Sequence, residues 1–532
     1  MSLTLSPLRG VGQPRRAGRR RFVPVLLVLA LLVAVVPAAL LLTRPHVRVE
    51  GLRSGATLNR SALTALVIRI AGADARPGGV RVSIDGRPMS PSPDAGALVV
   101  RPGALGDGRH RLRVDIPGRL PFGSAHLTRD FTVDTLPPAL ALGAAPPAAS
   151  LRTPVSLSGT VEPGARLTAD GKPVVVTRGR FELRYPQPPA AVRLVATDPA
   201  GNVTTRDVAV HVRHPQMRAV HLTALAWSAS VLREPVLAMA RAGKINAIEL
   251  DVKDESGDVG YASTVPLAVQ SGAATGVYDA RKVLDQLHAM NVRVVGRIVC
   301  FRDPRLAQWA WGHGRREMVI QGPDGTPYKS RYGEFSFTNF ADPTVRRYNI
   351  DLATEAARLG FDDILYDYVR RPDGKLSSMR FPGIAGTPEA SVAGFVRDSR
   401  GPIRAGGAYL GLSVFGIAAT RPTEIAQDIP AMGRYADYVS PMVYPSHWGP
   451  GEYGVANPNA SPYDIVRLSL VDFQKDLKGT DTAVIPWLQD FSLGRHYGPA
   501  EVAAQIRGAR SVGIDSFLLW NAGARYQAAA LG

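Results

Sequence analysis

The pattern of hydrophobic and polar residues changes once along the chain. Between residues 47 and 213, short runs rich in β-branched residues, such as VRVEG and GVRVSIDGRP, alternate with turn residues. Alternation with a period of two and a turn signal about every 8–12 residues is typical of β-sandwiches. From Ala219 onward, apolar strand-like runs alternate with amphipathic helical stretches, which is the pattern of parallel α/β structure.

The α/β part contains eight predicted strands separated by helices. We place the strands at Val220–Ala226, Ala247–Val252, Arg293–Phe301, Asp363–Tyr368, Tyr409–Phe415, Tyr438–Tyr444, Ala483–Gln489 and Ser516–Trp520. Eight such strands predict a (β/α)₈ TIM barrel over residues 217–532. An open doubly wound sheet is the alternative, but it usually carries a glycine-rich phosphate loop after an early strand, and this sequence has none.

The β-rich part is predicted to form two sandwiches, at residues 47–136 and 137–213. The second contains the ordered segments G-T-V-E-P-G, L-T-A-D-G and L-V-A-T-D-P-A-G-N. These segments resemble bacterial Ig-like repeats of surface proteins. The resemblance implies a spacer or adhesive role for this region.

The N-terminal segment predicts a membrane anchor. Residues 1–21 hold six arginines and no acidic residue, and the 22 residues 22–43 carry no charge. An apolar run of this length can cross the hydrocarbon core, and the preceding arginines predict a cytoplasmic N-terminus with the barrel outside. A cleaved signal peptide is the alternative, although its apolar core should be shorter. Either way, we expect the barrel to be extracytoplasmic.

Charge and motif content narrow the function further. The net charge is +18, but no basic run resembles a nucleic-acid arm, so we expect no nucleic-acid partner. Cys300 is the only cysteine, so no internal disulfide can form. The sequence has no H-E-x-x-H, C-x-x-C, G-x-S-x-G or P-loop motif. We therefore expect no metal ion and no cofactor.

Polar, acidic and aromatic residues follow the predicted barrel strands. Catalytic residues of TIM barrels lie at the carboxyl ends of the strands. Here those ends read E-L-D-V-K-D after strand two, Y-D-Y-V-R-R-P after strand four, V-Y-P-S-H-W after strand six and W-L-Q-D-F after strand seven. Aromatic faces can stack on sugar rings, and carboxylates can hold hydroxyl groups or attack an anomeric carbon, so these ends suit a carbohydrate.

Six ordered segments carry a family resemblance. They are I-E-L-D-V-K-D-E-S-G, R-I-V-C-F-R-D-P, G-F-D-D-I-L-Y-D-Y-V-R-R-P, S-P-M-V-Y-P-S-H-W, P-W-L-Q-D-F and L-L-W-N-A. Together they resemble the bacterial "putative glycosyl hydrolase" domain family, over roughly residues 217–526. The resemblance implies a TIM barrel with distant kinship to the alpha-amylase-like hydrolases.

The resemblance also implies catalytic candidates. Asp367 ends strand four, where alpha-amylase-like barrels place a nucleophilic aspartate; the alternative is that it forms a salt bridge with Arg297 or Arg370. In those barrels a glutamate after strand five supplies the acid, but here strand five ends S-V-F-G without an acidic residue. Asp490 and then Asp251 are the predicted substitutes, because glycoside hydrolysis requires a second carboxyl group.

Further side chains at the strand ends are predicted to bind the sugar. They are Arg297, Tyr366, Arg370, Tyr444, His447, Trp487, Gln489, Trp520 and Asn521. Two hypotheses follow: a membrane-anchored glycoside hydrolase acting on an envelope or extracellular polysaccharide, and a non-catalytic polysaccharide-binding protein that uses the same groove. The absence of the strand-five glutamate favours binding, and the acidic strand ends favour hydrolysis.

Overall fold

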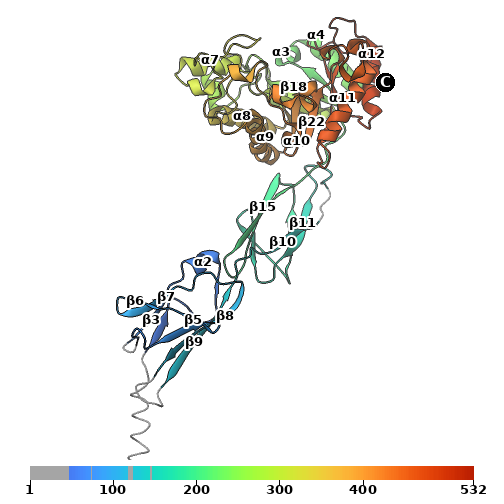
Figure 1. Ribbon diagram of the computed structural model, residues 1–532. Helices are drawn as coiled ribbons and strands as arrows, with labels where there is room; N and C mark the ends of the chain where they lie inside the picture. The colour runs from blue at the N-terminus through green and yellow to red at the C-terminus, as the bar shows by residue number, and fades with distance from the viewer. Residues whose placement is uncertain (1–46, 73–74, 118–123, 144–146) are drawn as a thin grey trace, which may run out of the picture. The chain divides into compact units, whose positions relative to one another are not determined.

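A computed structural model describes residues 47–72, 75–117, 124–143 and 147–532 (Figure 1). The predicted membrane anchor at residues 22–43 lies outside these residues. Within the described ranges, none of the helices has the length and apolar character needed to cross a membrane.

The region predicted as the first sandwich contains two sheets around an apolar core. In order across the sheet, one consists of β1 (Arg48–Glu50), β3 (Ile68–Ala71), β7 (Ala97–Val100) and β6 (Ser92–Asp94). The other consists of β2 (Ala56–Leu58), β9 (Ala125–Val133), β8 (Gly108–Ile116), β4 (Arg81–Ile84) and β5 (Arg87–Met89). Alternate residues such as Leu112 and Val114 of β8 are buried in this core, as the period of two predicts. The short helix α2 (Arg60–Thr64) connects β2 and β3.

Two further sheets occupy the region predicted as the second sandwich. One holds β10 (Leu140–Leu142), β11 (Val155–Val161) and β14 (Arg180–Tyr185). The other holds β13 (Lys172–Val174), β12 (Arg166–Ala169), β15 (Ala191–Thr197) and β16 (Val203–Ala209). The prediction of β-rich structure before the barrel is therefore confirmed.

The C-terminal part is a closed parallel barrel. Its strands are β17 (Arg218–Leu222), β18 (Ala247–Lys253), β19 (Arg293–Val299), β20 (Asp363–Asp367), β21 (Tyr409–Phe415), β22 (Tyr438–Met442), β23 (Ala483–Val484) with β24 (Trp487–Gln489), and β25 (Phe517–Trp520). Each strand pairs in parallel with its neighbours, and pairing of β21 with β22 closes the ring. The predicted TIM barrel is confirmed.

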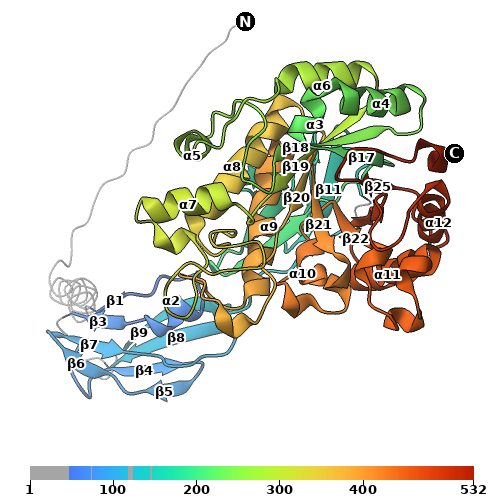
Figure 2. The same ribbon diagram turned by 90° about the horizontal axis from the view of Figure 1, so that it is seen from above.

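Helices surround the barrel strands (Figure 2). They are α3 (Ala224–Ser228), α4 (Ser230–Arg241), α5 (Pro266–Gln270), α6 (Ala280–Ala289), α7 (Pro304–Gly312), α8 (Pro343–Leu359), α9 (Pro388–Ala405), α10 (Ile429–Gly433), α11 (Pro462–Asp476) and α12 (Pro499–Arg510). One face of each strand packs on these helices, and residues such as Ile364 and Tyr366 of β20 belong to that outer core. Alternate residues such as Leu365 point into the barrel.

Two predicted strands differ from the observed ones by more than one or two residues at an end. The first strand ends at Leu222 instead of Ala226, because the Thr223 hydroxyl accepts a hydrogen bond from Ala226 N and caps α3. The seventh strand is divided between Val484 and Trp487 at Pro486, which has no N–H to donate to a neighbouring strand.

Candidate active site

One arginine side chain joins three carboxylates at the carboxyl ends of the barrel strands. Arg297 on β19 donates from Nη1 to Asp251 Oδ1 over 2.8 Å. Its Nε and Nη2 atoms donate to Asp367 Oδ2 over 2.9 and 2.6 Å. Nη2 also donates to Glu255 Oε1. We call Arg297, Asp251, Asp367 and Glu255 the arginine–carboxylate cluster.

The strand register explains this arrangement. Asp251 on β18 is the direct neighbour of Arg297, and Asp367 on β20 pairs with Val299, two residues further along β19. Residues two apart on a strand share a face, so the long Arg297 side chain can reach both acids inside the barrel. Glu255 comes from the loop that follows β18.

A histidine–glutamate pair lies beside this cluster. His221 on β17 is the direct neighbour of Glu249 on β18, and its Nδ1 atom contacts Glu249 Oε2. His221 Nε2 lies 3.8 Å from Asp251 Oδ2, and neither atom has a hydrogen-bond partner. The imidazole stacks on the Trp520 ring at a centroid distance of 4.3 Å. The other oxygen of Glu249, Oε1, lies 3.8 Å from Arg297 Nε.

The environment separates the pKa values of these acids. Burial opposes the charged form of Glu255, but the charge and hydrogen bond of Arg297 outweigh burial and lower the pKa to about 2. Burial raises the pKa of Asp251 to about 7, against the opposing charges of His221 and Arg297. Burial also raises the pKa of Glu249 well above its ordinary value and lowers that of His221 to about 4. Near neutral pH, the cluster therefore combines an ionised carboxylate with an acid that can hold a proton.

One guanidinium brings two possible catalytic carboxyl groups together. Asp251 bonds Arg297 Nη1, and Glu255 bonds Nη2 of the same planar group. Glycosidases likewise act with two neighbouring carboxyl groups. The positive charge among these acids is the Arg297 guanidinium; in the described part of the chain, no group of three or more His, Cys, Asp or Glu side chains could hold a metal ion.

A family match covers most of the barrel. Residues 219–526 match the family described as "Putative glycosyl hydrolase domain", and they make up more than half of the chain. The chain belongs to this family. The sequence resemblance is thereby confirmed. No curated protein matches the chain.

Several solved structures are similar to parts of this glycosyl hydrolase-family chain. A hypothetical protein from Ruminiclostridium thermocellum is 28% identical, with a TM-score of 0.33, covering 36% of this chain and 96% of its own. The PgaB (BpsB) glycoside hydrolase domain from Bordetella bronchiseptica is 15% identical, with a TM-score of 0.43 and coverages of 58% and 95%. A chitinase from Chromobacterium violaceum is 13% identical, with a TM-score of 0.36 and coverages of 59% and 97%. The family assignment rests on the family match.

Asp490, the first predicted substitute acid, is buried at the end of β24, outside the arginine–carboxylate cluster. Its Oδ2 atom accepts a hydrogen bond from Gln527 N over 2.8 Å, whereas Oδ1 is buried without a partner. Burial raises the pKa of this carboxyl group to about 6. Its contacts tie the C-terminal loop to the barrel, and its Oδ1 remains available to a proton.

Besides Tyr366, four of the predicted sugar-binding residues have aromatic or imidazole side chains. Trp520 is half-buried, and the guanidinium of Arg297 lies 5.2 Å from its ring centroid. His447 is exposed, and its ring lies 5.1 Å from that of the buried Tyr444. Trp487 is buried and donates to Ser413 Oγ over 2.8 Å. Trp520 and His447 are thus the two that a sugar could contact.

Other predicted sugar-binding side chains are already bonded within the protein. Tyr366 points into the outer core and stacks on Phe395, because neighbouring residues of a strand face opposite sides. Gln489 is fully buried; its Oε1 accepts from Ser446, and its Nε2 donates to the Phe491 carbonyl. These placements do not suit contact with a substrate.

The side chains of Asn521 and Arg370 also have partners within the protein. Asn521 donates to the carbonyls of Asp490 and Arg525. Arg370 is buried and donates from Nη1 to the Arg371 carbonyl over 2.8 Å. Asn521 therefore shapes the C-terminal loop, whereas Arg370 keeps a second nitrogen, Nη2, without a partner.

The sequence predictions did not include His221 and Glu255. His221 was placed inside a strand without a role, and only the pairing of β17 with β18 brings it against Glu249. Glu255 lies beyond the strand, in the segment D-E-S-G. The glycine of this segment, Gly257, was the signal available in the sequence. In the structure it has φ +84°, and a Cβ atom at this position would lie 2.2 Å from Asp303 Oδ1. That glycine indicates a tightly shaped loop around Glu255.

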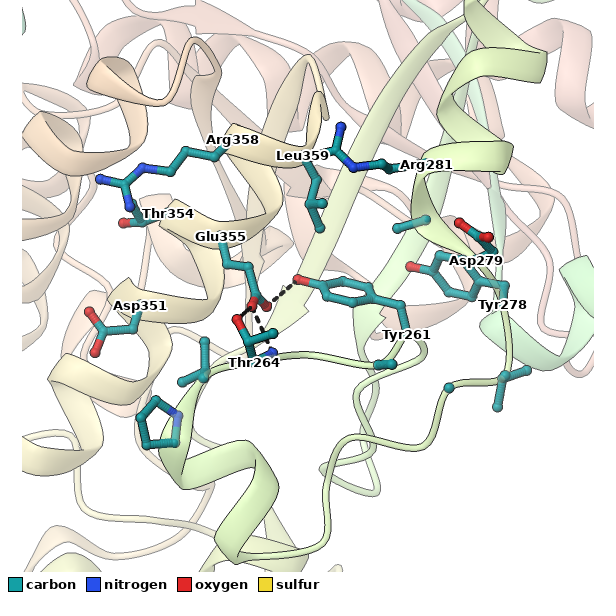
Figure 3. A pocket seen from close by; sticks show the side chains of 16 residues that line it. Tyr261, Thr264, Tyr278, Asp279, Arg281, Asp351, Thr354, Glu355, Arg358 and Leu359 are labelled. Carbon is teal, nitrogen blue, oxygen red and sulfur yellow. Dashed lines mark hydrogen bonds between the residues drawn. The ribbon is translucent and has the colours of Figure 1, made fainter.

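A pocket outside the barrel shows how this loop is held (Figure 3). It has a volume of about 820 Å³ and lies between the loop after β18 and helix α8. Glu355 on α8 accepts hydrogen bonds from the hydroxyl groups of Tyr261, Ser263 and Thr264 and from Thr264 N. We call this set the Glu355 latch. Both Glu355 oxygens already accept hydrogen bonds from the loop. Glu355 therefore positions the loop and does not serve as a catalytic acid.

Proposed function

We propose that the barrel hydrolyses glycosidic bonds of an extracytoplasmic polysaccharide, using the arginine–carboxylate cluster. The observation that carries this proposal is the separation of pKa values between Glu255, at about 2, and Asp251, at about 7. Neighbouring acids with pKa values pushed apart are how glycosidases provide both a proton and a charged carboxylate.

In this proposal Asp251 supplies the proton and Glu255 supplies the negative charge. An acid with a pKa near the working pH is both protonated and able to release its proton to the leaving oxygen. Glu255 stays ionised, and its side chain is 26% exposed, so it can approach an anomeric carbon or a water molecule.

Asp367 has a positioning role in this proposal. Its Oδ2 accepts both Arg297 bonds, its Oδ1 accepts a 2.6 Å bond from Tyr368 N, and its side chain is 6% exposed. A carboxylate held on both oxygens orients Arg297 better than it attacks a sugar. We therefore propose Glu255 as the nucleophile or charged carboxylate, in place of Asp367, which the sequence suggested.

Polysaccharide binding without hydrolysis is the second candidate function. One observation favours it: the Asp251 side chain is only 1% exposed. A proton donor must reach the glycosidic oxygen, so the second function would hold if substrate binding leaves Asp251 covered. We further propose that residues 22–43 hold the barrel at the outer surface of a membrane, as their uncharged sequence predicts.

The test is reducing-sugar release by the full chain from a panel of bacterial envelope and secreted polysaccharides. Asp251→Asn should lower release at least ~100-fold, because it removes the transferable proton and little volume. Glu234→Gln, an acid on α4 that is 50% exposed, is the matched control and should retain release. Binding of the same polysaccharides by wild type without release would support the second function.

A further inference from the structure

A second cluster of charged and aromatic side chains lies beside the candidate active site. Arg302 follows β19, Tyr368 and Arg370 follow β20, and Arg331 and Tyr332 belong to the segment between α7 and α8. We call these five residues the arginine–tyrosine cluster. Because the loops after β19 and β20 open on the carboxyl-end face, the cluster belongs to the same face as Asp367.

The side chains of this cluster stack on one another. The Arg302 guanidinium lies 4.2 Å from the Tyr332 ring centroid and 5.1 Å from that of Tyr368, and donates to the Tyr368 hydroxyl over 2.9 Å. The Arg331 guanidinium lies 4.8 Å from the Tyr332 ring centroid, and the Arg370 guanidinium lies 4.9 Å from the Tyr368 ring centroid. Guanidinium groups held against aromatic faces are oriented before a ligand arrives.

The cluster is connected directly to the arginine–carboxylate cluster. Tyr368 follows Asp367 in the chain and donates its N–H to Asp367 Oδ1. Tyr368 has φ +47°, a left-handed conformation that costs energy for a tyrosine. This conformation turns the chain after Asp367 and brings the Tyr368 ring against Arg302 and Arg370.

The cluster has more positive than negative charge. Asp373 pairs with Arg331 over 3.0 Å and with Arg370 over 3.4 Å. Arg302 forms no salt bridge with any acidic residue in the described ranges. Three guanidinium groups therefore share one carboxylate here. In addition, Arg370 is buried and its Nη2 atom has no hydrogen-bond partner.

The partly exposed members define the accessible side of the cluster. Arg302, Tyr332 and Tyr368 are half-buried, and Arg331 is exposed. The exposed imidazole of His447, at the end of β22, is close enough to Arg331 for the charges to interact. The accessible side of the cluster thus extends from Arg302 through Arg331 toward His447.

We propose that the arginine–tyrosine cluster is a subsite for a sugar residue that carries a carboxylate, so that the polysaccharide substrate contains uronic acids. Arg302 would bind the carboxylate and Tyr332 would pack against the sugar ring. This inference rests on the proposed function and names the substrate class. Arginine presents two parallel N–H donors that match a carboxylate, whereas a neutral sugar would leave the excess positive charge uncompensated.

The test measures binding separately from hydrolysis. Oligomers of galacturonate, glucuronate and mannuronate are titrated calorimetrically into the full chain carrying Glu255→Gln, which prevents cleavage. The same oligomers with their carboxyl groups chemically reduced to alcohols serve as neutral probes. At least one uronate oligomer should bind about tenfold or more tightly than its reduced form. Equal binding of the charged and reduced forms, or no binding of any uronate, would overturn the inference.

A variant pair then locates the subsite. Arg302→Gln should weaken uronate binding about tenfold or more, whereas Arg316→Gln should leave it unchanged. Arg316 is a suitable control because it is exposed and also stacks on an aromatic ring, that of Trp311, outside the cluster. Matching thermal unfolding midpoints establish that both variants fold. Equal weakening by both variants, or by neither, contradicts the assignment.

The two proposals can fail independently. Cleavage of neutral polysaccharides by the wild type, with no dependence of binding on Arg302, removes the uronate subsite and leaves the hydrolase. Arg302-dependent binding of uronates without cleavage by the wild type removes the hydrolase and leaves the subsite. Tighter binding of sulfated than of carboxylated oligomers would show that the cluster recognises charge without preferring a carboxylate, and would also overturn the inference.

Discussion

Arg297 Nη1 lies 2.8 Å from Asp251 Oδ1, and both side chains are 1% exposed. Although it faces a guanidinium, Asp251 has a pKa of about 7, because burial disfavours its charged form more than Arg297 and His221 favour it. Arg297 interacts with several acids. Its charge and hydrogen bond favour the ionised form of Glu255 strongly enough to lower the pKa of that group to about 2. One arginine therefore holds together acids in different protonation states.

Replacing Arg297 by methionine should strongly destabilise the barrel. The change leaves the carboxyl groups of Glu255 and Asp367 without their main partner, and Asp367 lies in a buried site. Removing one partner of a buried ion pair typically costs about 3–5 kcal/mol. Urea unfolding should show a corresponding fall in the free energy of unfolding. Arg241→Met, at an exposed pair with Glu234, should change it by less than about 1 kcal/mol, and equal effects would contradict the central role of Arg297.

The pH dependence of kcat/KM should report the proton on Asp251. Its pKa of about 7 means that the protonated fraction is high below pH 6 and falls about tenfold per pH unit well above 7. Glu255, with a pKa of about 2, stays ionised throughout that range. We therefore expect kcat/KM to be level at mildly acidic pH and to decline above pH 7. A rate that rises through pH 7 would show that an ionised Asp251 is required.

Gly257→Ala should impair catalysis by moving Glu255. Gly257 has φ +84°, and an added Cβ atom would meet Asp303 Oδ1 at 2.2 Å. Gly276→Ala, between α5 and α6, is the control, because this glycine has φ +69° but its nearest neighbour would be 3.9 Å away. Both substitutions strain the backbone, and only the first also displaces a buried side chain. Initial rates should fall at least about tenfold more for the first variant; similar rates would contradict the steric argument.

Glu355→Gln should loosen the loop after β18. The amide side chain keeps the size of Glu355 but has one acceptor oxygen in place of two, so it cannot accept all the bonds from Tyr261, Ser263 and Thr264. Hydrogen exchange of the Thr264 amide should become faster, since this N–H donates to Glu355 Oε1. Helix α12, which has no contact with the Glu355 latch, should exchange at an unchanged rate. Unchanged exchange at Thr264 would show that the latch does not hold the loop.

The fold could be predicted from the sequence because the barrel strands are runs of mainly apolar residues separated by amphipathic helical segments. Strand ends were less predictable. Thr223 caps a helix where the apolar run suggested more strand, and Pro486 divides the seventh strand. The first difference arises from the hydroxyl group of Thr223 and the second from the missing N–H of Pro486, and a hydrophobic pattern registers neither.

The candidate site was predicted in part. Asp251, Arg297 and Asp367 were recognised because they lie at strand ends, but their mutual contacts depend on register. Tyr366 illustrates what the pattern could have excluded, since it precedes Asp367 and therefore faces the helices. Gln489 illustrates what it could not, because its side chain accepts hydrogen bonds from Ser446, which comes from a distant part of the chain.

The most direct test of the account is the initial rate of reducing-end formation by wild type and by Glu255→Gln on one cleaved polysaccharide. We expect the variant to bind the polysaccharide as well as wild type does and to cleave it at least ~100-fold more slowly, because an amide carries no negative charge. Cleavage by Glu255→Gln at the wild-type rate would contradict the assignment of the arginine–carboxylate cluster as the active site.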